Sequence, residues 1–165
     1  MVSFEVNDEF VKWKTYSNEN LLSRFSASEW KEIAADISSV EEWKDFLSTY
    51  SEYVQCYVLE NITKSTDIAF AYLYKESSKV ISIHGGGWLN PLLYYRGYIL
   101  LIRRILENGY KVRTSCNLCN PAAIRFSRSA GFIPYNYTSS KVYMWISERT
   151  LKRTFLYKRF YSDTI

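Results

Sequence analysis

Several features that would mark a membrane protein or a disulfide-stabilised secreted protein are missing from this sequence. None of its apolar stretches is long enough to span a bilayer, and residues 1–10 carry acidic side chains where a signal peptide carries basic ones. It has three cysteines, an odd number that argues against a disulfide framework. We therefore expect a cytoplasmic protein with reduced thiols and no membrane partner.

Concentrated charge of one sign is also missing. The formal net charge is +4, and no uninterrupted run of about five or six basic residues occurs. This balance allows anionic ligands, and we expect no nucleic-acid partner. Basic side chains are densest in residues 148–165, where they alternate with Leu151, Phe155, Leu156 and Phe160. The spacing predicts an amphipathic helix with one buried stripe and one solvated face.

Linkers, internal repeats and low-complexity tracts are absent as well, so we expect a single domain covering residues 1–165. Apolar material is plentiful, with hydrophobic residues making up 47% of the chain and aromatic residues 18%. That content is enough for one contiguous core. It also predicts broad apolar walls that carry tyrosine hydroxyls.

The pattern of apolar residues divides the domain into three parts. Residues 1–52 are predicted to be helical after a short start, because Ser26 and Ser39 each open a capping box that is followed by apolar residues at helical spacing. Residues 53–147 form the predicted core, and residues 148–165 form the amphipathic extension.

The core alternates between strand-like and helix-like segments. The predicted strands are 53–60, 67–75, 79–84, 110–116, 132–138 and 141–147, and the predicted helices are 91–108 and 121–130. With two N-terminal helices the order is α-α-β-β-β-α-β-α-β-β. This order predicts an α/β or α+β domain with a mixed sheet and one β-α-β crossover.

Two Asn-Pro pairs, Asn90-Pro91 and Asn120-Pro121, stand at the starts of the two core helices. Asn caps a helix because its side-chain oxygen accepts from a first-turn N–H, and Pro is tolerated at the next position because its missing N–H would have no partner. Each pair follows a strand, so both helix N-termini lie at the edge of the sheet where the strands end. Ligands of open sheets bind at that edge, and helix N-termini favour phosphate.

The residues around the second pair resemble a known motif. Asn120 is followed by Ala123 three residues on, by Phe126 six residues on, and by Gly131-Phe132 at the helix exit. This arrangement resembles the fourth-helix motif of the GNAT (GCN5-related) N-acetyltransferases, and the predicted element order is also that of the GNAT fold. The sequence therefore resembles an atypical member of this family.

The resemblance implies an enzyme that moves an acetyl group from acetyl-CoA to the amine of a small molecule or peptide, by direct attack in a ternary complex. The acceptor site would be formed by the N-terminal helices, strand 53–60 and the loop after residue 132. The implied acyl-CoA site consists of Ile83, His84, Gly85, Gly86, Trp88, Leu92, Leu93, Tyr94, Arg96, Asn120, Ala123 and Phe126.

The loop that holds pyrophosphate in this family departs from its usual pattern here. The family sequence Gln/Arg-x-x-Gly-x-Gly/Ala would fall on residues 88–93, which contain none of its expected residues. Glycines stand just upstream, at 85–87, and suit a backbone that approaches a ligand closely or bulges from a strand. Pro91 removes one donor, so the expected donors are the N–H groups of Leu92, Leu93 and Tyr94, with Arg96 as counter-charge.

Proton transfer is assigned to two residues. His84 is the only histidine and ends the strand that pairs with the pantetheine arm in GNAT proteins, so it is the candidate general base, with Glu60 as a weaker alternative. The motif aromatic, often a Tyr that protonates the leaving thiolate, is Phe126 here. Tyr137, or its neighbour Tyr135, is the candidate replacement.

Three alternatives accompany this interpretation. A GNAT-shaped CoA-binding or scaffold protein without turnover would also explain the missing glycine motif and Phe126. Cys116 and Cys119 form a C-x-x-C before a helix, where thiol pKa values fall, so a dithiol redox function is conceivable. No metal site is expected, because one His supplies no second ligand pair. A lipase-type oxyanion loop at residues 84–87 is discarded because no Gly-x-Ser-x-Gly occurs.

Overall fold

A computed structural model describes residues 3–17, 20 and 39–161. Eight strands and five helices lie within these residues. Their order is β1 (Val6–Asn7), β2 (Val11–Tyr16), α3 (Val40–Thr49), β3 (Val54–Asn61), β4 (Thr66–Lys75), β5 (Val80–Gly87), α4 (Pro91–Glu107), β6 (Lys111–Asn117), α5 (Pro121–Ala130), β7 (Ile133–Tyr137), β8 (Lys141–Ile146), α6 (Glu148–Arg153) and α7 (Phe155–Tyr161).

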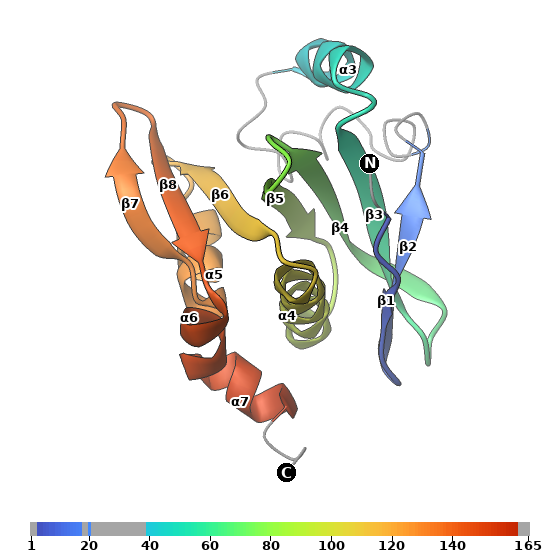
Figure 1. The fold of residues 1–165 in the computed structure, drawn as a ribbon. Helices are drawn as coiled ribbons and strands as arrows, with labels where there is room; N and C mark the ends of the chain where they lie inside the picture. Colours follow the sequence, from blue (N-terminus) through green and yellow to red (C-terminus); the bar gives the residue numbers. More distant parts are fainter. Residues whose placement is uncertain (1–2, 18–19, 21–38, 162–165) are drawn as a thin grey trace.

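All eight strands join one sheet in the order β1-β2-β3-β4-β5-β6-β8-β7 (Figure 1). Only β5 and β6 run parallel, and α4 makes the crossover between them. Every other neighbouring pair is antiparallel. The expected mixed α/β sheet with a single β-α-β crossover is therefore confirmed.

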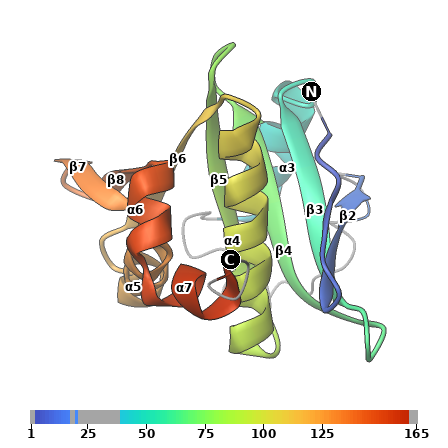
Figure 2. The ribbon, with the colours of Figure 1, turned by 60° about the horizontal axis from the view of Figure 1, so that its bottom comes forward.

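Helices cover both faces of the sheet. On one face, Ile81 and Ile83 of β5 share the larger core with Ile99 of α4. On the other face, Trp43 and Leu47 of α3 belong to a second, smaller core cluster. Figure 2 shows α4 in front of the central strands and α3 behind them. Because side chains alternate along a strand, neighbouring residues of β5 and β6 reach opposite sides of the molecule.

The parallel strands β5 and β6 pair over a short stretch only. The ladder joins Val80–Ser82 to Lys111–Arg113 and then stops. One further hydrogen bond joins the two strands: the Thr114 hydroxyl donates to the Ile83 carbonyl oxygen at 2.7 Å. Beyond it, the two strands separate towards the N-termini of α4 and α5.

The N-terminal segment is not simply a short start to a helical region, as the sequence analysis predicted. Residues 6–16 form the hairpin β1-β2, and β2 extends the sheet by pairing with β3. Val11 and Trp13 are buried while Lys12 is exposed, which is the alternation of a half-buried strand. Asp8 fixes the turn, because its Oδ1 accepts from the backbone N–H groups of Phe10 and Val11 at 2.7 and 2.9 Å.

The two predicted N-terminal helices have different outcomes. The helix opened by Ser39 is present as α3, and the Ser39 hydroxyl accepts from the Glu42 N–H at 3.0 Å. The helix expected to open at Ser26 lies outside the described residues. None of the described helices is both long and apolar enough to cross a membrane.

The C-terminal segment is two short helices rather than one amphipathic helix. Thr154 adopts an extended conformation between α6 and α7, and its hydroxyl donates to the Leu151 carbonyl and accepts from the Tyr157 N–H. The break rotates α7, so Leu151 is 1% exposed whereas Phe155 is 73% exposed. The predicted stripe was therefore wrong at Phe155.

Candidate functional site

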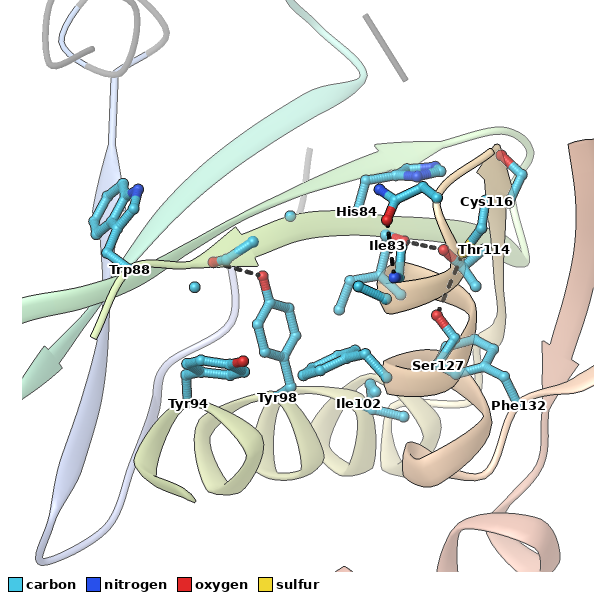
Figure 3. Close-up of a pocket in the computed structure, with 18 residues that line it drawn as sticks. Ile83, His84, Trp88, Tyr94, Tyr98, Ile102, Thr114, Cys116, Ser127 and Phe132 are labelled. Atoms are coloured by element: carbon cyan, nitrogen blue, oxygen red, sulfur yellow. Dashed lines mark hydrogen bonds between the residues drawn. The ribbon is translucent and has the colours of Figure 1, made fainter. Parts of the chain in front are cut away.

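A cavity of about 540 Å³ opens where β5 and β6 separate (Figure 3). It lies between the end of β5, the end of β6, the face of α4 that carries Tyr94, Tyr98 and Ile102, and the first two turns of α5. Its lining residues are Ile83, His84, Gly85, Gly86, Gly87, Trp88, Tyr94, Tyr98, Ile102, Thr114, Ser115, Cys116, Asn120, Ala122, Ala123, Phe126, Ser127 and Phe132. We call it the first cavity.

Tyrosines of α4 explain the glycines at the end of β5. A Cβ on Gly85 would lie 2.1 Å from the Tyr98 hydroxyl oxygen and 2.2 Å from the Phe70 carbonyl oxygen. A Cβ on Gly87 would lie 2.4 Å from the ring of Tyr94. The Tyr98 hydroxyl donates to the Phe70 carbonyl, and burial raises the pKa of this phenol. The sequence predicted that these glycines allow a ligand to approach the backbone closely; in the structure, the side chains of Tyr94 and Tyr98 approach it.

The backbone of β5 presents a donor to the first cavity. The Ile83 carbonyl faces β6, because it accepts from Thr114. The N–H and C=O of one residue point to the same edge of a strand, and this edge alternates from residue to residue. The N–H of Gly85 therefore points to the same edge as the Ile83 carbonyl, beyond the last ladder pair with β6.

The start of α5 is built as its sequence predicts. Asn120 caps the helix, with its Oδ1 accepting from the Ala123 N–H at 3.1 Å. Phe126 faces α4, where its ring centroid lies 4.4 Å from that of Tyr95 and 5.1 Å from that of Tyr98. Gly131 ends the helix in the left-handed region with φ of 107°.

The start of α4 offers fewer backbone donors than predicted. The N–H groups of Leu93 and Tyr94 donate to the Asn90 carbonyl at 3.0 and 3.1 Å. Those of Trp88 and Leu89 donate to the Ile68 carbonyl at 2.8 and 3.2 Å. Of the predicted donors, Leu92 alone has no hydrogen bond within the described part of the chain.

Arg96 points away from the first cavity. Its Nε donates to Asp8 Oδ2, and its guanidinium carbon lies 4.4 Å from the centre of the Phe10 ring. The β1-β2 hairpin therefore occupies the charge that the sequence analysis assigned to a ligand. Leu92 and Leu93 do not line the first cavity either, and Leu92 is 45% exposed.

A second cavity of about 190 Å³ lies on the α3 face of the sheet. Its lining residues are Glu42, Trp43, Phe46, Tyr72, His84, Ser115 and Lys141. His84 and Ser115 line both cavities, since their side chains stand on the α3 face of two strands that have separated. The two cavities therefore share His84 and Ser115 as lining residues, and we call this place between β5 and β6 the junction.

His84 sits in an electropositive, desolvated position. Its ring stacks on Tyr72 with centroids 5.0 Å apart. Burial, with smaller effects from Lys141 and Arg113, lowers the pKa of His84 to about 4. The imidazole is consequently neutral at physiological pH and is a weaker proton acceptor than an ordinary histidine.

No protein-family model and no curated protein matches the sequence. Solved structures do match. FdhC, described as a nucleotide-linked sugar GNAT, gives a TM-score of 0.71 at 10% identity over 98% of both chains. A GNAT acetyltransferase from Bacillus anthracis gives 0.67 at 10% identity over 88% of this chain and 99% of that one. The aminoglycoside acetyltransferase AAC(6')-Ib, solved with ribostamycin and coenzyme A, gives 0.66 at 17% identity over 89% and 98%.

The chain has the GNAT fold. In this fold the predicted site residues separate into two groups. Ile83, His84, Gly85, Gly86, Trp88, Tyr94, Asn120, Ala123 and Phe126 all line the first cavity. Leu92, Leu93, Arg96 and Tyr137 do not.

Of the residues proposed for proton transfer, some line a cavity and others do not. Tyr137 is 62% exposed on the edge strand β7, and Tyr135 accepts from Arg113 at 3.1 Å. Neither lines either cavity. Glu60 pairs with Lys14 at 2.9 Å and lines neither cavity. Only His84 of the proposed acids and bases lies at the junction.

The cysteine pair does not form a disulfide. Cys116 is buried in the first cavity, with its Sγ 3.5 Å from the Ser127 hydroxyl, whereas Cys119 is exposed. Among the described residues, no group of three or more His, Cys, Asp or Glu side chains could hold a metal ion.

Several lining residues escaped the sequence analysis. Tyr98 and Ile102 follow Tyr94 at intervals of four, so they share its helix face, and this period was readable. Thr114 and Cys116 are two residues apart on β6, so they share one face of the strand, and this period was also readable. Ser115 carried no such signal, because its place at the junction depends on where β5 and β6 separate.

Proposed function

We propose that the protein is an acetyl-CoA-dependent N-acetyltransferase that acts on an amine in a ternary complex. The observation that supports this most strongly is the pair of cavities on opposite faces of the sheet that share His84 and Ser115 between the separated strands. A donor in the first cavity and an acceptor in the second would touch only at His84 and Ser115. Complexes of AAC(6')-Ib with acetyl-CoA or coenzyme A and an aminoglycoside are consistent with this arrangement.

The residues present fit the acyl-pantetheine part of acetyl-CoA. The first cavity extends along the separated ends of β5 and β6. Ala123 and Phe126 give it an apolar wall, and Asn120 gives it a polar residue at the start of α5. Acetyl-CoA would supply an activated acyl group. The Gly85 N–H would donate to the thioester oxygen and stabilise the negative charge that develops there.

The pyrophosphate has a weaker site than the acyl arm. The start of α4 supplies the Leu92 N–H and the positive end of a long helix, and no acidic residue stands in its first turn. Arg96 is already paired with Asp8. We therefore expect acetyl-CoA to bind mainly through the pantetheine arm, with lower affinity than a full glycine loop would give.

Direct deprotonation of an ammonium by His84 is unfavourable. With a pKa near 4, the imidazole lies about six units below a typical alkylammonium, which corresponds to about 8 kcal/mol. His84 is better suited to accept a hydrogen bond from an amine that arrives neutral. The amine nitrogen then bonds to the acyl carbon and loses its proton to water, and the carbon–sulfur bond breaks.

Tyr94 replaces Tyr137 as the proposed proton donor to the leaving thiolate. It lines the first cavity, and its ring centroid lies 5.7 Å from that of Phe126, the position of the motif aromatic. Burial raises the pKa of Tyr94, so the phenol stays protonated. The hydroxyl of Tyr98 is already used by the Phe70 carbonyl.

Calorimetric titration with acetyl-CoA, followed by a thiol-release assay over an amine library, tests the proposal. We expect binding and release of CoA with at least one amine. Binding without release over the whole library would leave the scaffold alternative, and no binding would reject both. Tyr94→Phe is expected to lower kcat by roughly a hundredfold or more while the acetyl-CoA affinity stays unchanged, since proton transfer by a positioned side chain contributes about 10²–10⁴-fold.

Asn120 separates ligand contact from helix capping. Asn120→Ala is expected to weaken acetyl-CoA binding by roughly 1–2 kcal/mol and to destabilise the protein by about 1 kcal/mol. Asn120→Ser keeps a capping hydroxyl, so it restores the stability. If Asn120→Ser also restores the affinity, Asn120 acts only as a cap.

A further inference from the structure

The second cavity carries information about the acceptor that the proposed function leaves open. Three aromatic side chains, Trp43, Phe46 and Tyr72, form one wall; the centroids of the Trp43 and Tyr72 rings lie 4.6 Å apart. At about 190 Å³ the space equals that of about six water molecules in the liquid. The wall and the volume suit the reacting part of a compact molecule with a flat apolar body.

Two charged side chains also line this cavity, and they are not equivalent. Lys141, at the start of β8, is partly buried, whereas Glu42, on α3, is exposed. Charges that are open to solvent are screened, so Glu42 contributes less to the potential inside the cavity than Lys141 does. No ion pair of Lys141 exists within the described residues.

The positive charges of Lys141 and Arg113 act at His84, beside which the proposed reaction would occur. Lys141 and Arg113 both act on the His84 imidazole and disfavour its protonated form. Arg113 is compensated by Glu76 at 2.6 Å, whereas Lys141 forms no ion pair among the described residues and the carboxylate of the same cavity, Glu42, is exposed to solvent. A second cationic group on the acceptor would be repelled here, and an anionic group would be attracted.

We infer that the acceptor is a compact amine that also carries an anionic group, and that Lys141 binds this group in the second cavity. The inference rests on the proposed function, whose amine site it specifies. A carboxylate and a phosphate share the required chemistry. An anionic partner for Lys141 would place the amine of the same molecule beside His84 and Ser115.

Three probes of similar shape test the inference. They are 4-(aminomethyl)benzoate, the neutral 4-(aminomethyl)benzamide and the dicationic 1,4-bis(aminomethyl)benzene. Each has a ring for the aromatic wall and an aminomethyl group that can react, and they differ chiefly in the charge of the group at the other end of the ring. Binding of each probe is measured by calorimetry without acetyl-CoA, and kcat/KM is measured with it; a phosphonate analogue then compares phosphate with carboxylate chemistry.

The wild-type protein is expected to bind the benzoate about tenfold more tightly than the benzamide, and the dication most weakly, since one favourable charge pair of this kind is worth about that factor. Lys141→Gln should remove the preference and Lys141→Arg should keep it. Lys111→Gln makes the same charge change on an exposed residue outside both cavities, so it should keep the preference.

The outcomes separate this inference from the proposed function. Equal binding of the three probes, tighter binding of the dication, binding of none, or an unchanged preference in Lys141→Gln would each overturn the inference. Failure of acetyl-CoA to bind would instead reject the proposed function, while the probe preference would still report on the second cavity. A benzoate preference lost in Lys141→Gln, with unaltered acetyl-CoA affinity, is the supporting result.

Discussion

The His84 imidazole links the electrostatics of the site to the stability of the whole chain. Its pKa is about 4 in the folded protein and about 6.5 when it is freely solvated. The unfolded chain therefore binds a proton between these values that the folded protein does not bind. Stability contributed by neutral His84 is present above pH 6.5 and is lost as the pH falls towards 4.

This difference predicts a pH-dependent free energy of unfolding. Between pH 7 and pH 5 the wild-type protein should lose about 2 kcal/mol through His84. His84→Gln cannot titrate, so its loss over this range should be smaller by that amount. Urea denaturation of both proteins at the two pH values measures the difference. Parallel losses in both would show that the pKa of His84 is close to its ordinary value.

At the scale of elements, the C-terminal helices show how one residue changes a pattern. Leu151 and Phe155 are four residues apart, so in one continuous helix they would share a face. Thr154 interrupts the helix with an extended backbone, and the two side chains then differ in exposure from 1% to 73%. Although the two residues are spaced as on one helix face, we expect Leu151 to contribute much more to stability than Phe155.

Paired substitutions measure this difference. Leu151→Ala should lower the free energy of unfolding by roughly 2–4 kcal/mol, because it leaves a cavity in the core. Phe155→Ala removes an exposed ring and should change stability by no more than about 0.5 kcal/mol. Comparable losses in the two variants, measured by urea denaturation, would indicate a continuous helix with both residues buried.

Elements with strong local signals were predictable, and those that depend on distant partners were not. Asn90, Asn120 and Gly131 mark helix ends through their own backbone chemistry, and α4 and α5 begin or end where these residues predict. The β1-β2 hairpin was missed because two strands of two and six residues give little periodicity by themselves. β2 becomes a strand by pairing with β3, which lies further along the chain beyond α3, and β1 pairs with β2 alone.

The site follows the same rule. Residues carried by the α5 motif, such as Ala123 and Phe126, line the first cavity, and their contact with acetyl-CoA stays a prediction. Arg96 does not, because Asp8 reaches it from the unforeseen hairpin. Tyr137 does not, because β7 is the outermost strand of the sheet. Closeness to the helix exit in the sequence therefore does not place Tyr137 in the first cavity, although Phe132 does line it.

At the scale of the molecule, the sheet itself divides the proposed donor side from the acceptor side. Helices α4 and α5 bound the first cavity, α3 bounds the second, and His84 of β5 and Ser115 of β6 line both. A ligand in the first cavity would touch both strands and both helices. Its binding should therefore stabilise the whole sheet rather than one edge of it.

This coupling predicts a thermal shift. Acetyl-CoA at about one hundred times its Kd should stabilise the folded state by about 2.7 kcal/mol, which for a chain of this size corresponds to a rise in Tm of roughly 5–10 °C. Asn120→Ala at the same concentration should show a smaller rise, because its Kd is higher. Differential scanning calorimetry at several concentrations gives both values. If acetyl-CoA binds by calorimetry yet leaves Tm unchanged, it binds folded and unfolded chains alike, and the cavity between β5 and β6 is not its site.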